Sequence, residues 1–150
     1  MKYTLFLLAI FVSLISCKTE VKTVEGDLYF KLIDPYRVFD APDSVLKKIE
    51  TTASLVNKDD EVLRFMVEKR LLRKPFIRIV DDNGEINIVF LNSADYEKIK
   101  DYTYDELIKE NKKIRVRLEG LDLHHKSLKV YETSKLIAIE QIDGKTQWKK

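Results

Sequence analysis

Alternating hydrophobic and polar positions predict five β-strands along this chain of 150 residues. In the first, residues 27–33, Leu28, Phe30 and Leu32 fall on one face of an extended segment. The most regular alternation runs through residues 113–121, where every second residue from Ile114 to Leu118 is apolar. The other strands are expected at residues 76–80, 85–91 and 128–142, the last of them interrupted at Thr133 and Ser134.

In residues 40–73 the apolar residues recur at helical intervals. An apolar stripe runs along this segment, and Asp40 is a suitable N-cap with Pro42 in the first turn (stripe: Val45, Leu46, Ile49, Ala53, Val56). A second helix start is predicted at Asp59, and basic residues at 69–74 mark the end of this helical segment before Pro75. The pattern fits one bent helix or two helices. Short helices are also predicted after Asn92 and from the capping box at residues 103–106.

Turn residues separate these elements. Asp82-Asn83-Gly84 predicts a β-hairpin with a type I′ turn, because Asn-Gly tolerates the positive φ angles of that turn. Asn111 can end the preceding helix in a left-handed conformation. Gly120 permits a bend or bulge in the strand around it.

The order of elements is strand, helical segment, strand, strand, helix, strand, strand. This order predicts an α+β, mainly antiparallel fold: an OB-like five-stranded barrel with a helical insertion after the first strand. The alternative is an open antiparallel sheet with helices on one face. The length fits a single domain, which we place at residues 27–145 with a C-terminal tail at 146–150.

The N-terminus has a different pattern. A mostly apolar run at residues 5–15 follows one cation, Lys2, and precedes the small residue Ser16 and the single cysteine, Cys17. This layout predicts a secretory signal at residues 1–16. Residues 17–26 are short and polar, and we expect them to form an extended tether that holds the domain off the bilayer.

Leu14-Ile15-Ser16-Cys17 resembles the lipobox of bacterial lipoproteins. The resemblance implies cleavage before Cys17, a diacylglyceryl group on its thiol and acylation of the new amine. The partner of the protein would then be a membrane, bound through the lipid on Cys17. Two or more acyl chains make such an anchor stable. Lys18 is not the aspartate associated with inner-membrane retention, which favours the outer membrane, in either leaflet. Residues 26–32 and 41–44 are similar to small uncharacterised lipoproteins of Gram-negative bacteria.

Charge and composition narrow the possible partners. Without Lys2 the chain has 26 basic and 25 acidic residues, and this near-neutral balance gives no general attraction to nucleic acid. No apolar run approaches the length that spans a bilayer. A single cysteine allows no internal disulfide.

Basic residues on the last strands are the candidate ligand-binding residues. Arg115, Arg117 and Lys129 could share one face of the sheet, with Tyr131 as an aromatic platform. The alternative is a solvated outer face on which these cations pair with Glu119 and Glu132. Lys112, Lys113 and Lys126 are further members of this basic group, and Tyr29 is another candidate platform.

Catalytic and metal-binding patterns are weak. His124 and His125 are the only histidines, and neighbours on an extended chain point apart, so we expect loop residues and no metal or other cofactor. No serine lies in a nucleophile-elbow context, and lipidation would consume the Cys17 thiol. We therefore expect a non-enzymatic binding or adaptor module for another envelope component. The alternatives are a lipoprotein that binds a small molecule or glycan, and an envelope hydrolase with an unrecognised site.

Overall fold

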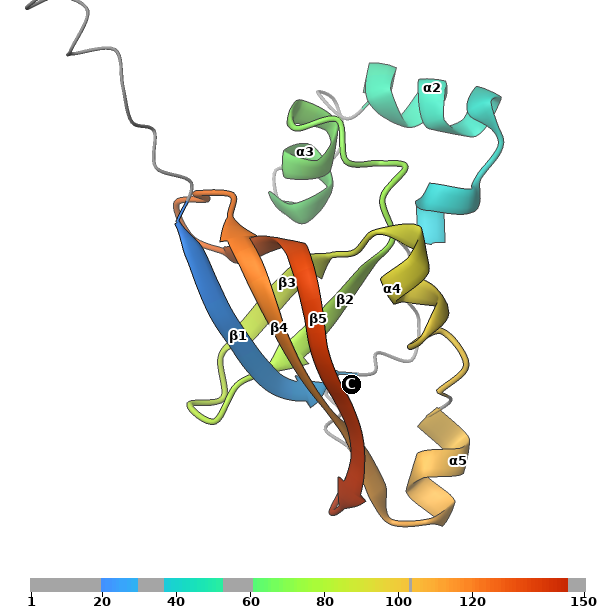
Figure 1. Ribbon diagram of the computed structural model, residues 1–150. Coiled ribbons are helices and arrows are strands. Elements are labelled where there is room, and N and C mark those ends of the chain that lie inside the picture. Colours follow the sequence, from blue (N-terminus) through green and yellow to red (C-terminus); the bar gives the residue numbers. More distant parts are fainter. Residues whose placement is uncertain (1–19, 30–36, 53–60, 103, 146–150) are drawn as a thin grey trace, which may run out of the picture.

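The computed structural model describes residues 20–29, 37–52, 61–102 and 104–145. Five strands and several short helices make up this part of the chain (Figure 1). The strands are β1 (Val21–Leu28), β2 (Phe76–Val80), β3 (Ile86–Phe90), β4 (Lys112–Asp122) and β5 (Lys129–Asp143). The helices are the 3-10 helix η1 (Arg37–Asp40), α2 (Asp43–Thr52), α3 (Glu61–Glu68), α4 (Ser93–Glu97) and α5 (Tyr104–Lys109).

The strands form a closed barrel in the order β1-β2-β3-β5-β4. The ring closes because β1 pairs with both β2 and β4, and only the β3–β5 pair is parallel. The prediction of an α+β, mainly antiparallel barrel is confirmed, and the alternative of an open sheet is wrong. Among the described residues, no helix is long and apolar enough to cross a membrane.

The first strand begins earlier than the alternation predicted. β1 starts at Val21, not at residue 27, so six residues of the expected tether lie in the barrel wall. Gly26 sits where the backbone of β2 crosses closely, since a Cβ atom there would lie 2.4 Å from the carbonyl oxygen of Val80. Gly26 therefore permits strand packing and does not end a tether. Phe30 and Leu32 lie outside the described residues.

The β2–β3 hairpin forms as predicted, but its turn differs. The Gly84 N–H donates to the Asp81 carbonyl oxygen at 2.9 Å, and within this described loop only Gly84 has a positive φ, at 80°. A type I′ turn needs positive φ at both central residues, so that prediction is wrong. The three-residue loop is a type I turn followed by a glycine bulge, and the Asp81 carboxylate accepts from the N–H groups of Asn83 and Glu85.

The described residues of the helical insertion form η1, α2 and α3, and the residues between α2 and α3 lie outside the described ranges. α3 ends at Glu68, before the basic residues that were expected within it. Arg70 takes a left-handed conformation with φ 58°, and the N–H of Leu71 reaches back to the carbonyl of Met66 at 2.7 Å. This is the Schellman ending of a helix, with arginine at the position that usually holds glycine.

The remaining local predictions are largely confirmed. Asn92 caps α4 by accepting from the N–H of Asp95 at 2.8 Å, and Asn111 is left-handed with φ 49°. The proposed cap Thr103 lies outside the described residues. The expected break at Thr133 and Ser134 is not a break: β5 is continuous, and its register to β4 shifts there and again near Ile137.

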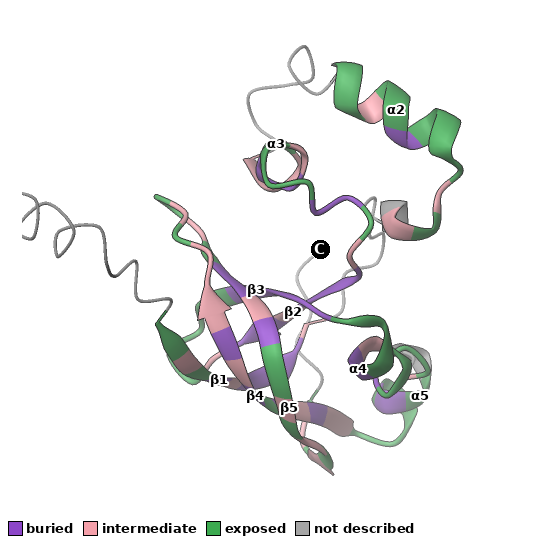
Figure 2. Cartoon of the chain, turned by 45° about the horizontal axis from the view of Figure 1, so that its top comes forward, coloured by how far each residue is buried: buried purple, intermediate pink, exposed green. Residues whose placement is uncertain are grey.

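The barrel wall separates two hydrophobic cores. The first fills the interior and includes Val24, Ile79, Val89, Val116 and Tyr131. The second lies outside the wall, between β2, β3 and β5 and the helical insertion (Leu46, Phe65, Met66, Leu71, Leu72, Phe76, Ile88, Phe90, Val130). Figure 2 shows buried positions both along the strands and in the segment that leads from α3 to the barrel.

Candidate functional site

The outer face of β2, β3 and β5 is apolar and covered by the insertion. Phe76 and Phe90 pair across β2 and β3 with ring centroids 5.6 Å apart, and Ile88 and Val130 extend this face. Met66 on α3 is fully buried against it. A solvent-exposed sheet face of this composition would be unfavourable, so the insertion completes the fold at this position.

Arg73 ties the end of the insertion to its beginning. Its guanidinium donates to the carbonyl oxygens of Phe39, at 3.4 Å, and Ala41, at 2.8 Å. The same group forms an ion pair with Asp43, in the first turn of α2. One residue therefore holds η1, the start of α2 and the segment after α3 in a fixed relation.

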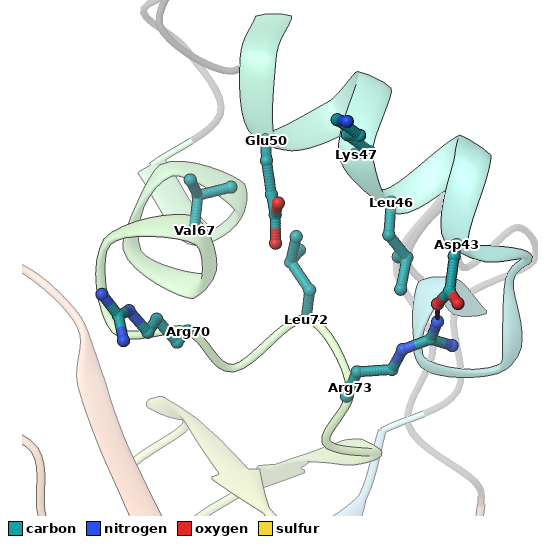
Figure 3. A pocket seen from close by; sticks show the side chains of 8 residues that line it. All are labelled: Asp43, Leu46, Lys47, Glu50, Val67, Arg70, Leu72 and Arg73. Atoms are coloured by element: carbon teal, nitrogen blue, oxygen red, sulfur yellow. Dashed lines mark hydrogen bonds and ion pairs between the residues drawn. The ribbon is translucent and has the colours of Figure 1, made fainter.

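A groove of about 590 Å³ lies between α2 and the segment that follows α3 (Figure 3). Its apolar lining comes from Leu46, Val67 and Leu72, and Glu50 extends from α2 toward Leu72. The polar lining is Asp43, Lys47, Glu50, Arg70 and Arg73. Neither Lys47 nor Arg70 forms an ion pair with another residue in the described part of the chain. This lining suits a ligand with an apolar part and charged groups beside it.

Arg115 and Arg117, predicted to bind a ligand, instead join an ion-pair ladder across β1 and β4. Arg115 donates to Glu25 at 2.9 Å, to Asp27 at 3.3 Å and to both Asp82 oxygens at 2.8 and 3.0 Å. Arg117 donates to the other oxygen of Glu25 at 2.9 Å. The bond from Arg115 holds the pKa of Glu25 below its ordinary value.

These contacts match the alternative of paired cations, although the partners differ from those expected. The acids that neutralise Arg115 and Arg117 lie on β1 and in the β2–β3 hairpin, while Glu132 pairs with Lys74. The prediction that Glu119 and Glu132 neutralise this face is therefore wrong.

Lys129 and Tyr131 do not join the arginines in a site. Lys129 pairs with Glu85 and lies 3.7 Å from Asp81, and the bond to Glu85 raises the pKa of Lys129. Tyr131 is 9% exposed and belongs to the barrel interior. The prediction of an exposed aromatic platform at Tyr131 is wrong, because alternation along β5 turns that side chain inward.

The histidine loop contacts the insertion. The ring of His125 packs edge-on against Phe65 at 5.0 Å, and its Nδ1 accepts from the N–H groups of Ser127 and Leu128 at 3.3 and 3.1 Å. The Ser127 hydroxyl donates to Glu61, which starts α3. The Ser127 hydroxyl also lies 3.5 Å from His125 Nδ1, and His125 Nε2 lies 3.8 Å from Glu61, so these three side chains meet at the start of α3. Tertiary packing alone creates the contact, and no local sequence pattern indicates it.

His124 remains exposed next to Asp122. The Asp122 carboxylate accepts from the backbone N–H of His124 at 2.8 Å and from Lys22 at 2.9 Å, and the Lys22 bond lowers the pKa of Asp122. Within the described ranges, no group of three or more histidine, cysteine, aspartate or glutamate side chains is placed to hold a metal ion.

Comparisons with protein families, with curated proteins and with solved structures find no match for this chain. The class of protein is therefore defined by its own geometry: a closed, mixed five-stranded barrel with the insertion that contains α2 and α3 on one outer face.

Proposed function

We propose that this protein is a lipid-anchored envelope lipoprotein and a non-enzymatic binding module, in which the α2–α3 insertion carries the binding groove. Cys17 holds the lipid, and the barrel is OB-like. The bound component is another envelope protein, and the outer membrane is the proposed location.

The strand order supports the OB-like assignment. The barrel order, the parallel β3–β5 pair and the helices between β3 and β4 all agree with it. OB folds bind ligands on the face of strands two and three and with the loops after strands one and four. In this chain that face is covered by the insertion after β1, and the loop after β4 contacts the insertion through His125 and Phe65.

The single observation that carries the proposal is the groove on this insertion. It lies over the face where an OB-like barrel binds, and it combines an apolar floor with two cations, Lys47 and Arg70, that lack an ion-pair partner among the described residues. The β4 face, by contrast, has its arginines bound to acids. The groove lining contains no serine, cysteine or histidine, the residue types that form the nucleophile and base of a catalytic triad.

A second candidate function is binding of a small molecule or glycan in the same groove. Its volume of about 590 Å³ favours this candidate, because small-molecule sites span roughly 300–1,000 Å³.

Site-specific cross-linking in intact cells tests the proposal. A photoreactive amino acid replaces Lys47 in one variant and Lys135, exposed on β5, in a matched control. The proposal predicts a discrete cross-linked protein from position 47 and none from position 135, with loss of the product when Arg70→Glu is added. Equal products from both positions would contradict a groove-specific partner. No product at position 47, together with a small molecule that raises the melting temperature of the wild type but not of Lys47→Glu, would favour the second candidate.

A further inference from the structure

We infer that the end of the barrel formed by residues 122–128 and the start of α3 rests against the headgroups of the bilayer that holds Cys17. The inference rests on the proposed lipid anchor. It follows from the early start of β1, which leaves too little chain for the domain to stand away from the membrane.

The length of the tether is set by the first contact that fixes the chain to the barrel. The carbonyl oxygen of Glu20 already accepts from the N–H of Asp122 at 3.3 Å, and Val21 pairs with Leu121. Only three residue steps separate Cys17 from Glu20, and three steps span at most about 11 Å. A domain of about 125 residues has a radius of gyration of about 14 Å. The tether is thus shorter than the domain is wide, and the domain cannot turn its opposite end toward the anchor.

Several segments meet at this anchored end. Lys22 pairs with Asp122 at 2.9 Å, and the following loop exposes His124 and Lys126. Ser127 of the loop bonds Glu61, so the beginning of α3 lies there too. Figure 1 shows α2 and α3 at the same end of the barrel as the start of β1. A partner that occupies the insertion groove would therefore meet the domain on its membrane-proximal side.

The opposite end is separated from this one by the length of β4. That strand has 11 residues between Lys112 and Asp122, and its ends are about 33 Å apart at the usual rise per residue. α5 precedes β4 directly, so Lys109 marks the end away from the anchor.

Charge does not explain the contact. The charged residues at the anchored end include the acids Glu20, Glu61 and Asp122 and the bases Lys22 and Lys126, which nearly balance. A surface of this kind has little attraction to anionic lipid, because such attraction needs clustered basic residues. The contact is imposed by the short tether, and it should persist at high salt.

Fluorescence quenching on the lipidated full-length protein tests the orientation. Lys126→Cys and Lys109→Cys variants carry a thiol-reactive fluorophore, because lipid blocks the thiol of Cys17. They are reconstituted into vesicles of phosphatidylethanolamine and phosphatidylglycerol that contain a headgroup spin-labelled lipid. We expect quenching several-fold stronger at position 126 than at position 109, unchanged between about 50 and about 500 mM salt. Equal quenching, or stronger quenching at position 109, would overturn the inference.

A lengthened tether provides the matched control. Twenty Gly/Ser residues inserted after Lys18 extend the reach by roughly 25 Å, and they should bring the two positions close to equal quenching. If the difference persists with the long tether, the tether does not impose the orientation and the inference is wrong. Detergent-phase partitioning before reconstitution reports lipidation separately. A protein that stays in the aqueous phase refutes the anchor itself, whereas lipidated protein with equal quenching refutes only the orientation.

Discussion

Replacing Arg115 with alanine distinguishes a structural role for the β4 arginines from the ligand-binding role suggested by sequence. Arg115 bonds three carboxylates, and one of them, Asp27, is 4% exposed. Removing the guanidinium leaves Asp27 with Lys113 as its remaining partner. Glu25 keeps Arg117, and Asp82 is exposed to water. The variant should therefore lose stability, chiefly through Asp27.

The size of the loss follows from burial. Breaking a fully buried ion pair costs about 3–5 kcal/mol, whereas an exposed pair contributes about 0–1 kcal/mol. The Arg115 side chain is 23% exposed, between these limits, so we expect a loss of about 1.5–3 kcal/mol in the free energy of unfolding. Arg117 is 46% exposed and has one bonded acid, so Arg117→Ala should lose less than about 1 kcal/mol.

Urea unfolding, followed by far-ultraviolet circular dichroism, measures the free energy of unfolding of both variants. Cross-linking from position 47 measures binding. Arg115→Ala should unfold at clearly lower urea and keep the cross-link. Unchanged stability with loss of the cross-link would refute the structural role and restore Arg115 as a binding residue.

Three further predictions follow from packing and charge. Gly26→Ala places a Cβ atom 2.4 Å from the Val80 oxygen and should destabilise the fold by more than about 2 kcal/mol, whereas exposed Gly84→Ala should cost about 1 kcal/mol for its positive φ; equal melting temperatures would contradict this. Met66→Ala should cost about 2–5 kcal/mol and lower a single unfolding transition, with exposed Val45→Ala nearly silent; a separate early transition would show that the insertion unfolds independently. Stability should fall as the pH drops from about 5 through the ordinary carboxylate pKa near 4. Hydrogen-bond donors in the folded protein lower the pKa of four carboxyl groups (Glu25, Asp81, Asp122, Asp143). In this pH range these groups therefore take up protons on unfolding. Urea midpoints that rise toward pH 3 would refute that sign.

Local sequence patterns predicted those elements whose conformation depends on short-range interactions within the element. The hairpin, the Asn92 cap and the left-handed Asn111 all depend on neighbours a few residues away, and the alternation in β4 required only period two. The start of β1 could not be predicted in this way. Several of residues 21–26 have polar side chains, so this segment lacks a clear alternating pattern. It is a strand because it pairs with β4, which joins residues about 90 positions apart in sequence.

The candidate site was missed for a related reason. A run of cations on a strand indicates a basic face only if no acids lie opposite, and the register that brings Glu25 and Asp27 to Arg115 and Arg117 is a tertiary property. The groove depends on how α2 lies against the segment after α3, which the apolar stripes of the separate helices do not specify. Tyr131 was assigned to an exposed face, but both faces of this part of β5 are buried: Tyr131 lies in the barrel interior and Val130 lies under the insertion.

The anchor on Cys17 supports both the proposed function and the inferred orientation, and metabolic labelling tests it most directly. Cells that express the wild type or Cys17→Ser are grown with labelled palmitate, and the protein is recovered and sized. We expect labelled, processed wild type and an unlabelled Cys17→Ser precursor that keeps residues 1–16. Normal processing of the Cys17→Ser variant, or a wild type that takes up no label, would contradict it.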